Sequence, residues 1–436
     1  MKKHAVVGIA AAVSLPFLCI PVFLLACAFL LPPQYGETFL GELKEKCALL
    51  EETAGKRIVL IGGSGVAFGY DSALLHEAFP EYGVVNFGMY GGLGTKVMLD
   101  ISEDSIREGD IVILSPEQEA QTLSEYFNAR YLWQAADGDF SLLRRIKREN
   151  AGQMAGHFPG FALDKLRLFQ SGETPGTEGI YRRSSFNEYG DIRSELCLRN
   201  VMPGGMDSNT LVYYRAELLE EAFVQDMNEY AGKLQEKGAV VWYRFCPVNA
   251  LAVADGADGG KIAQYFEILQ EKLDFPIIGN PYDSILEAGW FYDTNFHLNA
   301  AGKTVNTVQL IRDIKAMRGD DRPVETSLPQ MPASAEALAG REVLKKEEYR
   351  GNADVRQVRV DVKTAMIEDY AFEGCSSLEA VILENPNPEE ILVGSHLLDG
   401  TGADIYVPEE SLTRYRLNYS WSVYSDRIKP LSTLKN

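Results

Sequence analysis

The chain has 436 residues, with 42 lysines and arginines against 62 aspartates and glutamates, and a formal net charge of −20. Its 46% hydrophobic and 24% charged residues are typical of globular proteins and exclude a mainly disordered or collagen-like chain. Because so acidic a surface repels phosphate backbones and no basic stripe interrupts it, a nucleic-acid partner is excluded too. At about 150 residues per domain, the length predicts two or three domains.

The first 35 residues differ from the rest, since they contain two lysines and no other formal charge. Lys2 and Lys3 precede an uncharged run over residues 5–31. At about 1.5 Å per residue this run suffices for a transmembrane helix, and the lysines place the amino terminus in the cytoplasm. We therefore predict an uncleaved signal anchor over residues 1–35 in the cell membrane, with the later domains extracytoplasmic. A cleaved signal peptide and a lipoprotein modified at Cys27 are the less favoured alternatives.

Strand and helix patterns alternate through the next part of the chain, residues 36–317. Apolar strands are predicted over residues 57–61, 84–87, 110–114 and 239–245. Helices are predicted over residues 39–52, 72–79, 96–107, 211–235, 262–273 and 300–314. This alternation predicts a three-layer α/β/α sandwich around a mostly parallel sheet, which binds ligands at the carboxyl ends of its strands. Residues 119–209 have little periodicity and are predicted to be an insertion over the sheet rim, serving either as part of a substrate pocket or as a structural cap.

A linker and a repeat follow the α/β domain. Residues 318–344 change to a composition rich in proline, serine and aspartate, which indicates a linker. Beyond it, three similar strand patterns begin 23 and then 24 residues apart, at Gln357, Ala380 and Asp404. A fixed period of this length is typical of a solenoid that contributes one strand per turn.

The segment between the first two of these strands carries a recognisable motif. Residues 371–378 read Ala-Phe-Glu-Gly-Cys-Ser-Ser-Leu. This motif resembles the consensus of the BspA-like leucine-rich repeats of bacterial surface proteins, and the resemblance extends over about residues 345–432. It implies a small leucine-rich repeat domain over residues 345–436, with a surface suited to a protein partner.

Three residues near the ends of predicted elements match the parts of a catalytic triad. Ser64 follows the first strand among three glycines, which let the backbone turn sharply and present the hydroxyl at the sheet edge. His297 precedes the last predicted helix, and Asp293 lies four residues earlier. A serine becomes a nucleophile when a base accepts its proton and a third group orients that base. Taken singly, each residue is explained as well by an ordinary turn.

The order of these residues resembles the SGNH or GDSL-like hydrolase superfamily. Residues 62–64 read Gly-Gly-Ser where that family has Gly-Asp-Ser, and residues 86–91 (Asn-Phe-Gly-Met-Tyr-Gly) match its second block. Residues 293–297 stand in place of its last block, Asp-x-x-His, before the terminal helix. The resemblance spans about residues 56–317.

The resemblance implies a catalytic role for each of these residues. Ser64 would be the nucleophile, His297 the general base and Asp293 the residue that orients it, while the backbone amides of Ser64 and Gly91 would form the oxyanion hole.

The six cysteines include no Cys-x-x-Cys pair, which disfavours a zinc ribbon or a disulfide framework. The sequence predicts no metal and no other cofactor.

Two departures from the family pattern concern the same site. The family's third block ends in an asparagine that donates to the oxyanion, whereas Glu117 and Gln118 stand at that point here. A carboxylate there repels an oxyanion unless it is protonated, so either Gln118 or a backbone amide substitutes for the asparagine, or catalysis is weak. In addition, Asp293 lies four residues before the histidine rather than three. With Asn86, the residues Glu117 and Gln118 are predicted to belong to the pocket.

The resemblance and the predicted export imply a membrane-anchored serine esterase or acyltransferase. Its substrates would be O-acyl groups, acetyl or D-alanyl, on an envelope polysaccharide or teichoic-type polymer. The alternative is a catalytically degenerate surface protein that binds glycan or protein through its pocket and repeats. The negative charge conflicts with an anionic polymer unless a local basic patch, such as Arg144, Arg145, Lys147 and Arg148, receives it.

Overall fold

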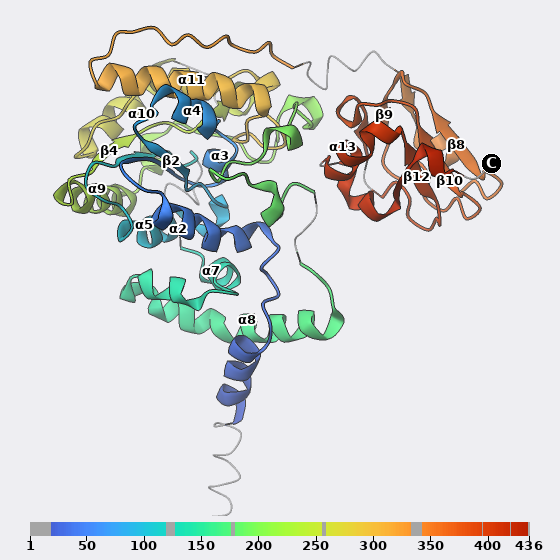
Figure 1. The fold of residues 1–436 in the computed structure, drawn as a ribbon, viewed down its shortest axis with the longest axis horizontal. Helices are drawn as coiled ribbons and strands as arrows, with labels where there is room; N and C mark the ends of the chain where they lie inside the picture. Colours follow the sequence, from blue (N-terminus) through green and yellow to red (C-terminus); the bar gives the residue numbers. More distant parts are fainter. Residues whose placement is uncertain are drawn as a thin grey trace, which may run out of the picture.

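The computed structural model describes residues 19–118, 127–175, 179–254, 259–332, 342–394, 396–418 and 420–434. It is a mixed α/β protein that contains several small parallel sheets. An α/β part lies above a pair of packed helices, and a β-rich part formed by the carboxyl-terminal residues lies to one side (Figure 1).

Four parallel strands form the central sheet, in the order β2-β1-β3-β4. They are β1 (Arg57–Ile61), β2 (Gly83–Asn86), β3 (Ile111–Leu114) and β4 (Val240–Tyr243). Every residue of β1 and β3 is buried, as expected for parallel strands that are covered on both faces. Successive side chains of β1 point to opposite faces, so that Ile58 and Leu60 enter one hydrophobic core and Val59 and Ile61 another.

Helices cover both faces of this sheet (Figure 1). One face carries α4 (Ser72–Ala78) and α11 (Ala300–Met317), and the other carries α2 (Leu43–Glu52), α5 (Thr95–Glu103) and α9 (Glu221–Glu236). Other elements of this part are α3 (Ser64–Ala67), α10 (Gly259–Lys272) and a small parallel pair, β5 (Val248–Asn249) with β6 (Ile285–Leu286).

The helix predicted over residues 211–235 is shorter in the structure, because α9 begins at Glu221. The preceding residues are extended: Val212 forms a bridge with Val253 and donates its N–H to the Ala252 carbonyl at 2.9 Å. Tyr214 is buried and packs edge-on against Tyr265. Leu211 and Leu218 are exposed, and residues 216–218 form a 3₁₀ turn, so the apolar residues at 211–218 do not make one buried face of a helix.

In the described part of the predicted insertion, the two α-helices α7 (Ala129–Ala135) and α8 (Ala151–Ser171) pack against each other. The pair lies under α2 and α5, away from the sheet (Figure 1). The sequence does not predict the 21-residue α8 because three glycines and Pro159 interrupt its first half, and both residue types disfavour helix. Residues 179–209 then return to the carboxyl end of the sheet, where Ile192 donates its N–H to the Ala67 carbonyl.

The transmembrane helix predicted as part of the fold is not found. Residues 1–18, which hold much of the predicted span over residues 5–31, lie outside the described residues. In the stretches that the structure does describe, no helix combines the length and the apolar character needed to cross a membrane. On this point the predicted fold is wrong.

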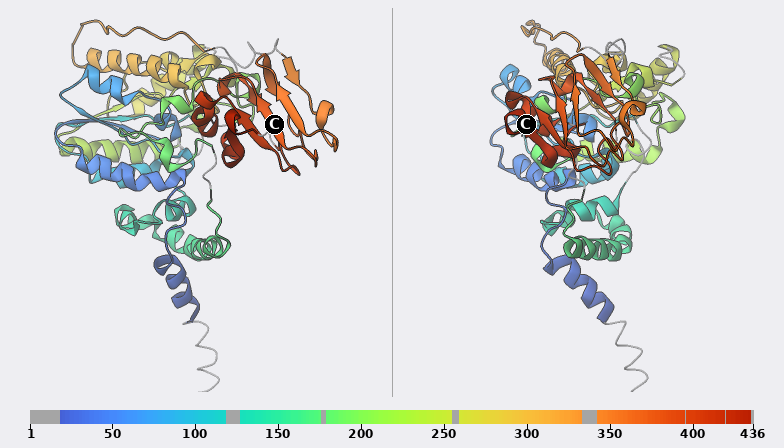
Figure 2. Two further views of the ribbon diagram at one scale, coloured as in Figure 1. Left: turned by 45° about the vertical axis from the view of Figure 1, so that its right-hand side comes forward. Right: turned by 90° about the vertical axis from the view of Figure 1, so that its right-hand side faces the viewer.

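The carboxyl-terminal part forms two parallel sheets around one core (Figure 2). The larger sheet has the order β13-β12-β10-β8, with β8 (Gln357–Val360), β10 (Ala380–Leu383), β12 (Asp404–Val407) and β13 (Ile428–Pro430). The smaller contains β7 (Glu342–Leu344), β9 (Thr364–Ile367) and β11 (Leu392–Val393), and two short helices are α12 (Lys346–Tyr349) and α13 (Leu412–Leu417). Strands thus form at all three repeat positions, where successive turns stack in register.

Candidate active site

Ser64 stands at the carboxyl end of β1, where it begins the short helix α3. The turn before it requires glycine because the chain after β3 passes very close. A Cβ atom at Gly62 would lie 2.4 Å from the Ser115 carbonyl oxygen, and one at Gly63 would lie 2.3 Å from a Glu117 carboxyl oxygen. Real Cβ atoms do not approach other atoms so closely, so these glycines allow the serine to sit in this crowded turn.

Asp293 and His297 come from a closed loop just before α11. The backbone N–H of Tyr292 donates to the His297 carbonyl at 2.8 Å, and the Thr294 hydroxyl accepts the N–H groups of Phe296 and His297. This turn places both side chains on one side of the loop. A spacing of four residues between the acid and the histidine therefore serves as well as the three of the family pattern.

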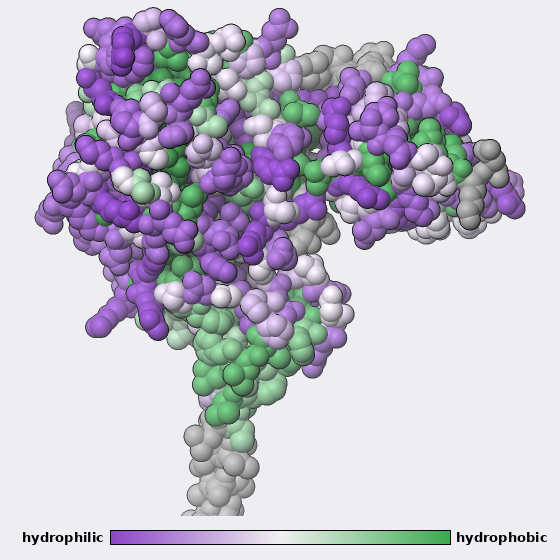
Figure 3. All heavy atoms as spheres, viewed as in Figure 1, coloured by the Kyte–Doolittle hydropathy of each residue, from purple (hydrophilic) through white to green (hydrophobic). Residues whose placement is uncertain are grey.

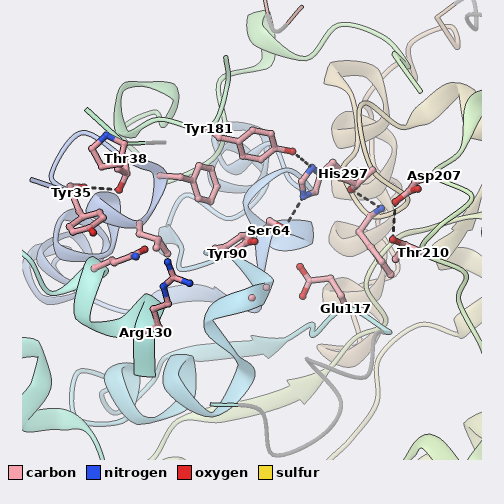
Figure 4. A pocket seen from close by; sticks show the side chains of 18 of the residues that line it. Tyr35, Thr38, Ser64, Tyr90, Glu117, Arg130, Tyr181, Asp207, Thr210 and His297 are labelled. Atoms are coloured by element: carbon pink, nitrogen blue, oxygen red, sulfur yellow. Dashed lines mark hydrogen bonds between the residues drawn. The ribbon is translucent and has the colours of Figure 1, made fainter. Parts of the chain in front are cut away.

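Ser64, His297 and Asp293 form a continuous chain of hydrogen bonds, and the bond between Ser64 and His297 is drawn in Figure 4. His297 Nε2 lies 2.8 Å from Ser64 Oγ, and Nδ1 lies 2.8 Å from Asp293 Oδ1. The imidazole stacks on the Phe68 ring at 3.9 Å between centroids and 4° between planes. The histidine and aspartate side chains are each only 5% exposed. Burial and stacking hold the imidazole in one orientation, which is what a general base requires.

Tyr181 adds a fourth group that the sequence does not predict. Its hydroxyl donates to Asp293 Oδ2 at 2.6 Å and lies 3.3 Å from His297 Nδ1. The residue belongs to the insertion, where no periodicity or motif distinguishes it from other tyrosines. It satisfies the carboxylate oxygen that the histidine leaves free, and so helps to fix the acid's orientation.

We expect Tyr181→Phe to lower kcat/KM for an aryl ester by roughly tenfold, since one hydrogen bond to a charged group is worth about 1.5 kcal/mol. Most of the fall should be in kcat, because the hydroxyl touches the triad rather than the acyl group. Tyr35→Phe is the matched control, because Tyr35 lines the same pocket on the opposite side from His297 (Figure 4). An equal loss in both variants would show that Tyr181 acts only as pocket lining.

The two residues whose backbone amides are predicted to form the oxyanion hole both line the pocket. Gly91 begins a tight turn, Gly91–Leu93, and both Gly91 and Ser64 line the pocket. Among the hydrogen bonds found in the described residues, none uses the backbone N–H of Ser64 or of Gly91. Two donors left without a protein acceptor beside the nucleophile are suited to a developing oxyanion.

Glu117 occupies the position of the family's asparagine, and its carboxyl group holds the nucleophile turn. One oxygen accepts the backbone N–H of Gly65 at 2.6 Å and the other that of Gly63 at 3.2 Å, so the two bonds flank Ser64. The side chain is nearly inaccessible and lines the pocket. Burial raises the pKa of Glu117 above its usual value, although the two amides and nearby His297 oppose that shift.

The structure places Asn86 and Gln118 elsewhere. Asn86 is buried behind α3, where its amide donates to the Val66 carbonyl and to Asp191. Gln118 donates to the Tyr213 carbonyl at 3.2 Å. Neither residue is part of the pocket lining, so both have structural roles, and of the third-block residues only Glu117 faces the site.

The triad opens into a pocket of about 760 Å³. The pocket extends from Ser64 and His297 past aromatic side chains to the helices of the insertion (Figure 4). Its outer part is lined by charged and polar groups of α7 and α8, namely Arg130, Gln134, Asp164 and Arg167. The insertion therefore forms one wall of the pocket rather than a separate cap.

Histidine, cysteine and carboxylate side chains do not gather into a possible metal site anywhere in the described ranges. The arrangement at Ser64 needs only acid–base groups and backbone donors. No protein-family model and no curated protein sequence matches the chain, so the resemblance to SGNH hydrolases and to BspA-like repeats stays a prediction.

Proposed function

We propose that this protein is a serine esterase or acyltransferase of the SGNH type. The observation that carries the proposal is the hydrogen-bonded chain from Ser64 through His297 to Asp293, which is buried at one end of a large pocket. Residues separated by more than two hundred positions supply the parts of one nucleophilic mechanism in hydrogen-bond contact. Such contact is the geometric requirement for an activated serine.

In this mechanism Ser64 Oγ attacks the carbonyl carbon of an acyl ester while His297 Nε2 takes its proton. Asp293 stabilises the imidazolium, and the backbone N–H groups of Ser64 and Gly91 hold the negative oxygen of the tetrahedral intermediate. Collapse breaks the ester bond, and His297 returns its proton to the departing alcohol. Water or a second hydroxyl compound then attacks the acyl-serine and releases the acid or the transferred ester.

The substrate class proposed is an O-acyl group, acetyl or D-alanyl, on an envelope polysaccharide or teichoic-type polymer. It rests on the resemblance, and the pocket supplies one supporting feature. Arg130 and Arg167 line its outer part together with Asp164, which lies 3.9 Å from Arg130, so this part carries two positive charges against one negative charge in a chain of −20. The basic cluster at residues 144–148 is a poorer receptor, because Arg145 pairs with Glu51 and none of the cluster lines the pocket.

A fluorophosphonate probe tests the proposal directly. The folded chain should form a covalent adduct at Ser64 and hydrolyse aryl acetates, whereas Ser64→Ala should do neither. Ser184→Ala is the matched control, because Ser184 is an exposed serine and lies outside the pocket lining. A wild-type protein that neither labels nor hydrolyses, although it is folded by circular dichroism, would overturn the catalytic proposal.

The second candidate is a pocket that binds acylated glycans or a protein without turnover. The observation that favours it is the Glu117 carboxyl group beside the nucleophile, where a negative charge opposes an oxyanion. Calorimetric binding of an acetylated oligosaccharide by a chain that fails to label would support this candidate. Rapid labelling of Ser64 together with ester turnover would exclude it.

A further inference from the structure

One surface of the molecule is unusually apolar for a protein with this composition. We name it the apolar platform, and it consists of the exposed side chains of residues 19–31 together with the outer face of α8 up to Leu163 (Figure 3). The exposed fractions of its large apolar side chains are high: Ile20 58%, Val22 65%, Phe23 50%, Leu25 47%, Phe29 45%, Leu30 81% and Leu163 50%. Contiguous apolar area of this kind marks a contact surface.

The composition of α8 is unlike that of a helix exposed to water. From Ala151 to Leu163 it contains no aspartate, glutamate, lysine or arginine, although most of these residues are exposed. Three glycines and Pro159 fall in the same stretch, so the helix also lacks the propensity and the charge pairs that stabilise a solvated helix. Its outer face is therefore built for a non-aqueous environment.

The platform is a rigid part of the fold. Phe29 packs against Phe140 at 4.7 Å and against Phe158 at 6.0 Å between ring centroids. Beneath them, the buried Lys165 Nζ donates to the Ala28 carbonyl at 2.8 Å and pairs with Asp137 at 2.6 Å. These contacts hold the later part of the segment, from Leu24 to Leu31, against the helical pair, while its first residues project away from α8 (Figure 1).

We propose that the apolar platform rests in the surface of a lipid bilayer with anionic headgroups, with α8 lying in the interface. Two further features select this occupant. The chain enters the platform from residues 5–18, which carry no formal charge. The helical pair and its connections, residues 129–172, hold seven lysines and arginines against four aspartates and glutamates, in a chain with net charge −20. Lys165 is buried, and Arg145 and Lys147 pair with carboxylates, but the net charge of this segment is positive. An apolar helical surface in a positively charged segment is typical of interfacial helices on anionic lipid.

The platform also bears on how a substrate reaches the pocket. Arg167 and Leu168, on the last turns of α8, line the outer part of the pocket, so platform and pocket share one helix. Docking of α8 on a bilayer places this end of the pocket at headgroup level. An acyl compound held in the membrane would then enter between α8 and the α/β part. The lipid contact itself is independent of whether Ser64 is active.

Site-directed spin labelling tests the lipid contact in the full chain. A nitroxide is attached at Leu163→Cys in a Cys19→Ser background, where the remaining cysteines are buried. The protein is bound to vesicles of phosphatidylcholine and phosphatidylglycerol, and collisions with oxygen and with a water-soluble nickel chelate are measured. Oxygen concentrates in hydrocarbon and the chelate is excluded, so we expect the oxygen-to-nickel ratio to rise on the order of tenfold over a control. The control is Val423→Cys, because Val423 is 55% exposed on the repeat domain.

Two results would overturn the proposal. If both reagents reach residue 163 as they reach residue 423, the platform faces water. If both are excluded, protein covers it, either a second copy or another partner. An Ala155→Cys label on the same face gives the same readout should the first variant fail to fold. Vesicles of phosphatidylcholine alone should lower the bound fraction several-fold, and an unchanged fraction would contradict the role given to anionic headgroups.

Discussion

Replacing His297 by asparagine is expected to lower kcat/KM for ester hydrolysis by roughly 10⁴-fold or more. The imidazole lies 2.8 Å from Ser64 Oγ, and no other described histidine lines the pocket to take over as base. Asp293→Asn should cost a similar factor, because an amide at 2.8 Å from Nδ1 favours the wrong imidazole tautomer. Steady-state hydrolysis of an aryl acetate measures both losses.

The repeat domain offers a matched control for this prediction. His396 Nδ1 lies 2.8 Å from Asp399, and its ring stacks on Tyr370 at 4° between planes, so its hydrogen bond and its stacking resemble those of the His297–Asp293 pair. Unlike that pair, both side chains are more than half exposed and lie outside the pocket lining. His396→Asn and Asp399→Asn should leave kcat/KM within about twofold of wild type. Equal losses in the two pairs would mean that instability rather than missing chemistry explains the effect.

The three triad residues can be predicted from the sequence because their chemistry and chain order are both distinctive. Ser64 follows a buried β-branched strand among glycines, and His297 stands just before a helix that Asn299 caps through its side chain. Tyr181 could not be predicted, since a lone tyrosine in an aperiodic segment carries no signal. The structural role of Glu117 also depends on two backbone amides, whose positions a sequence does not specify.

Some parts of the fold can likewise be predicted from the sequence and others cannot. The four central strands are predicted to within a few residues because each is a short, mostly apolar run in a sheet that is covered on both faces. Errors arise where tertiary contacts outweigh local pattern. The segment before Glu221 has helical spacing but pairs with Val253, whereas α8 forms despite Pro159 because its inner face packs on α7. The transmembrane span was predicted from hydropathy alone, and the described residues do not provide it.

Glu117→Ala should lower kcat/KM by on the order of 10²-fold, although Glu117 transfers no proton in the proposed mechanism. Its loss leaves the N–H groups of Gly63 and Gly65 without acceptors and opens space beneath the nucleophile turn. A displacement of Ser64 by about 1 Å is enough for a loss of this size. Glu117→Gln keeps one acceptor oxygen and should lose only about tenfold.

Gln118→Ala provides the control for this series, because Gln118 is a buried neighbour that lies outside the pocket lining. It should lower stability slightly and leave kcat/KM unchanged. A kcat/KM that falls from wild type to Glu117→Gln and again to Glu117→Ala is expected of a residue that positions the turn. If the negative charge of Glu117 instead impairs catalysis, Glu117→Gln will be faster than wild type, and the positioning role will be contradicted.

The pH dependence of stability follows from the same carboxyl group. Burial raises the native pKa of Glu117, so between its unfolded pKa of about 4.3 and its native pKa the folded chain binds more protons than the unfolded chain. The stability of wild type relative to Glu117→Gln should therefore be greatest below the unfolded pKa. It should fall as pH rises and become constant above the native pKa. Urea unfolding of both proteins across this range measures the difference. A relative stability that rises with pH would mean that the hydrogen bonds from the two amides stabilise the charged carboxylate more than burial destabilises it.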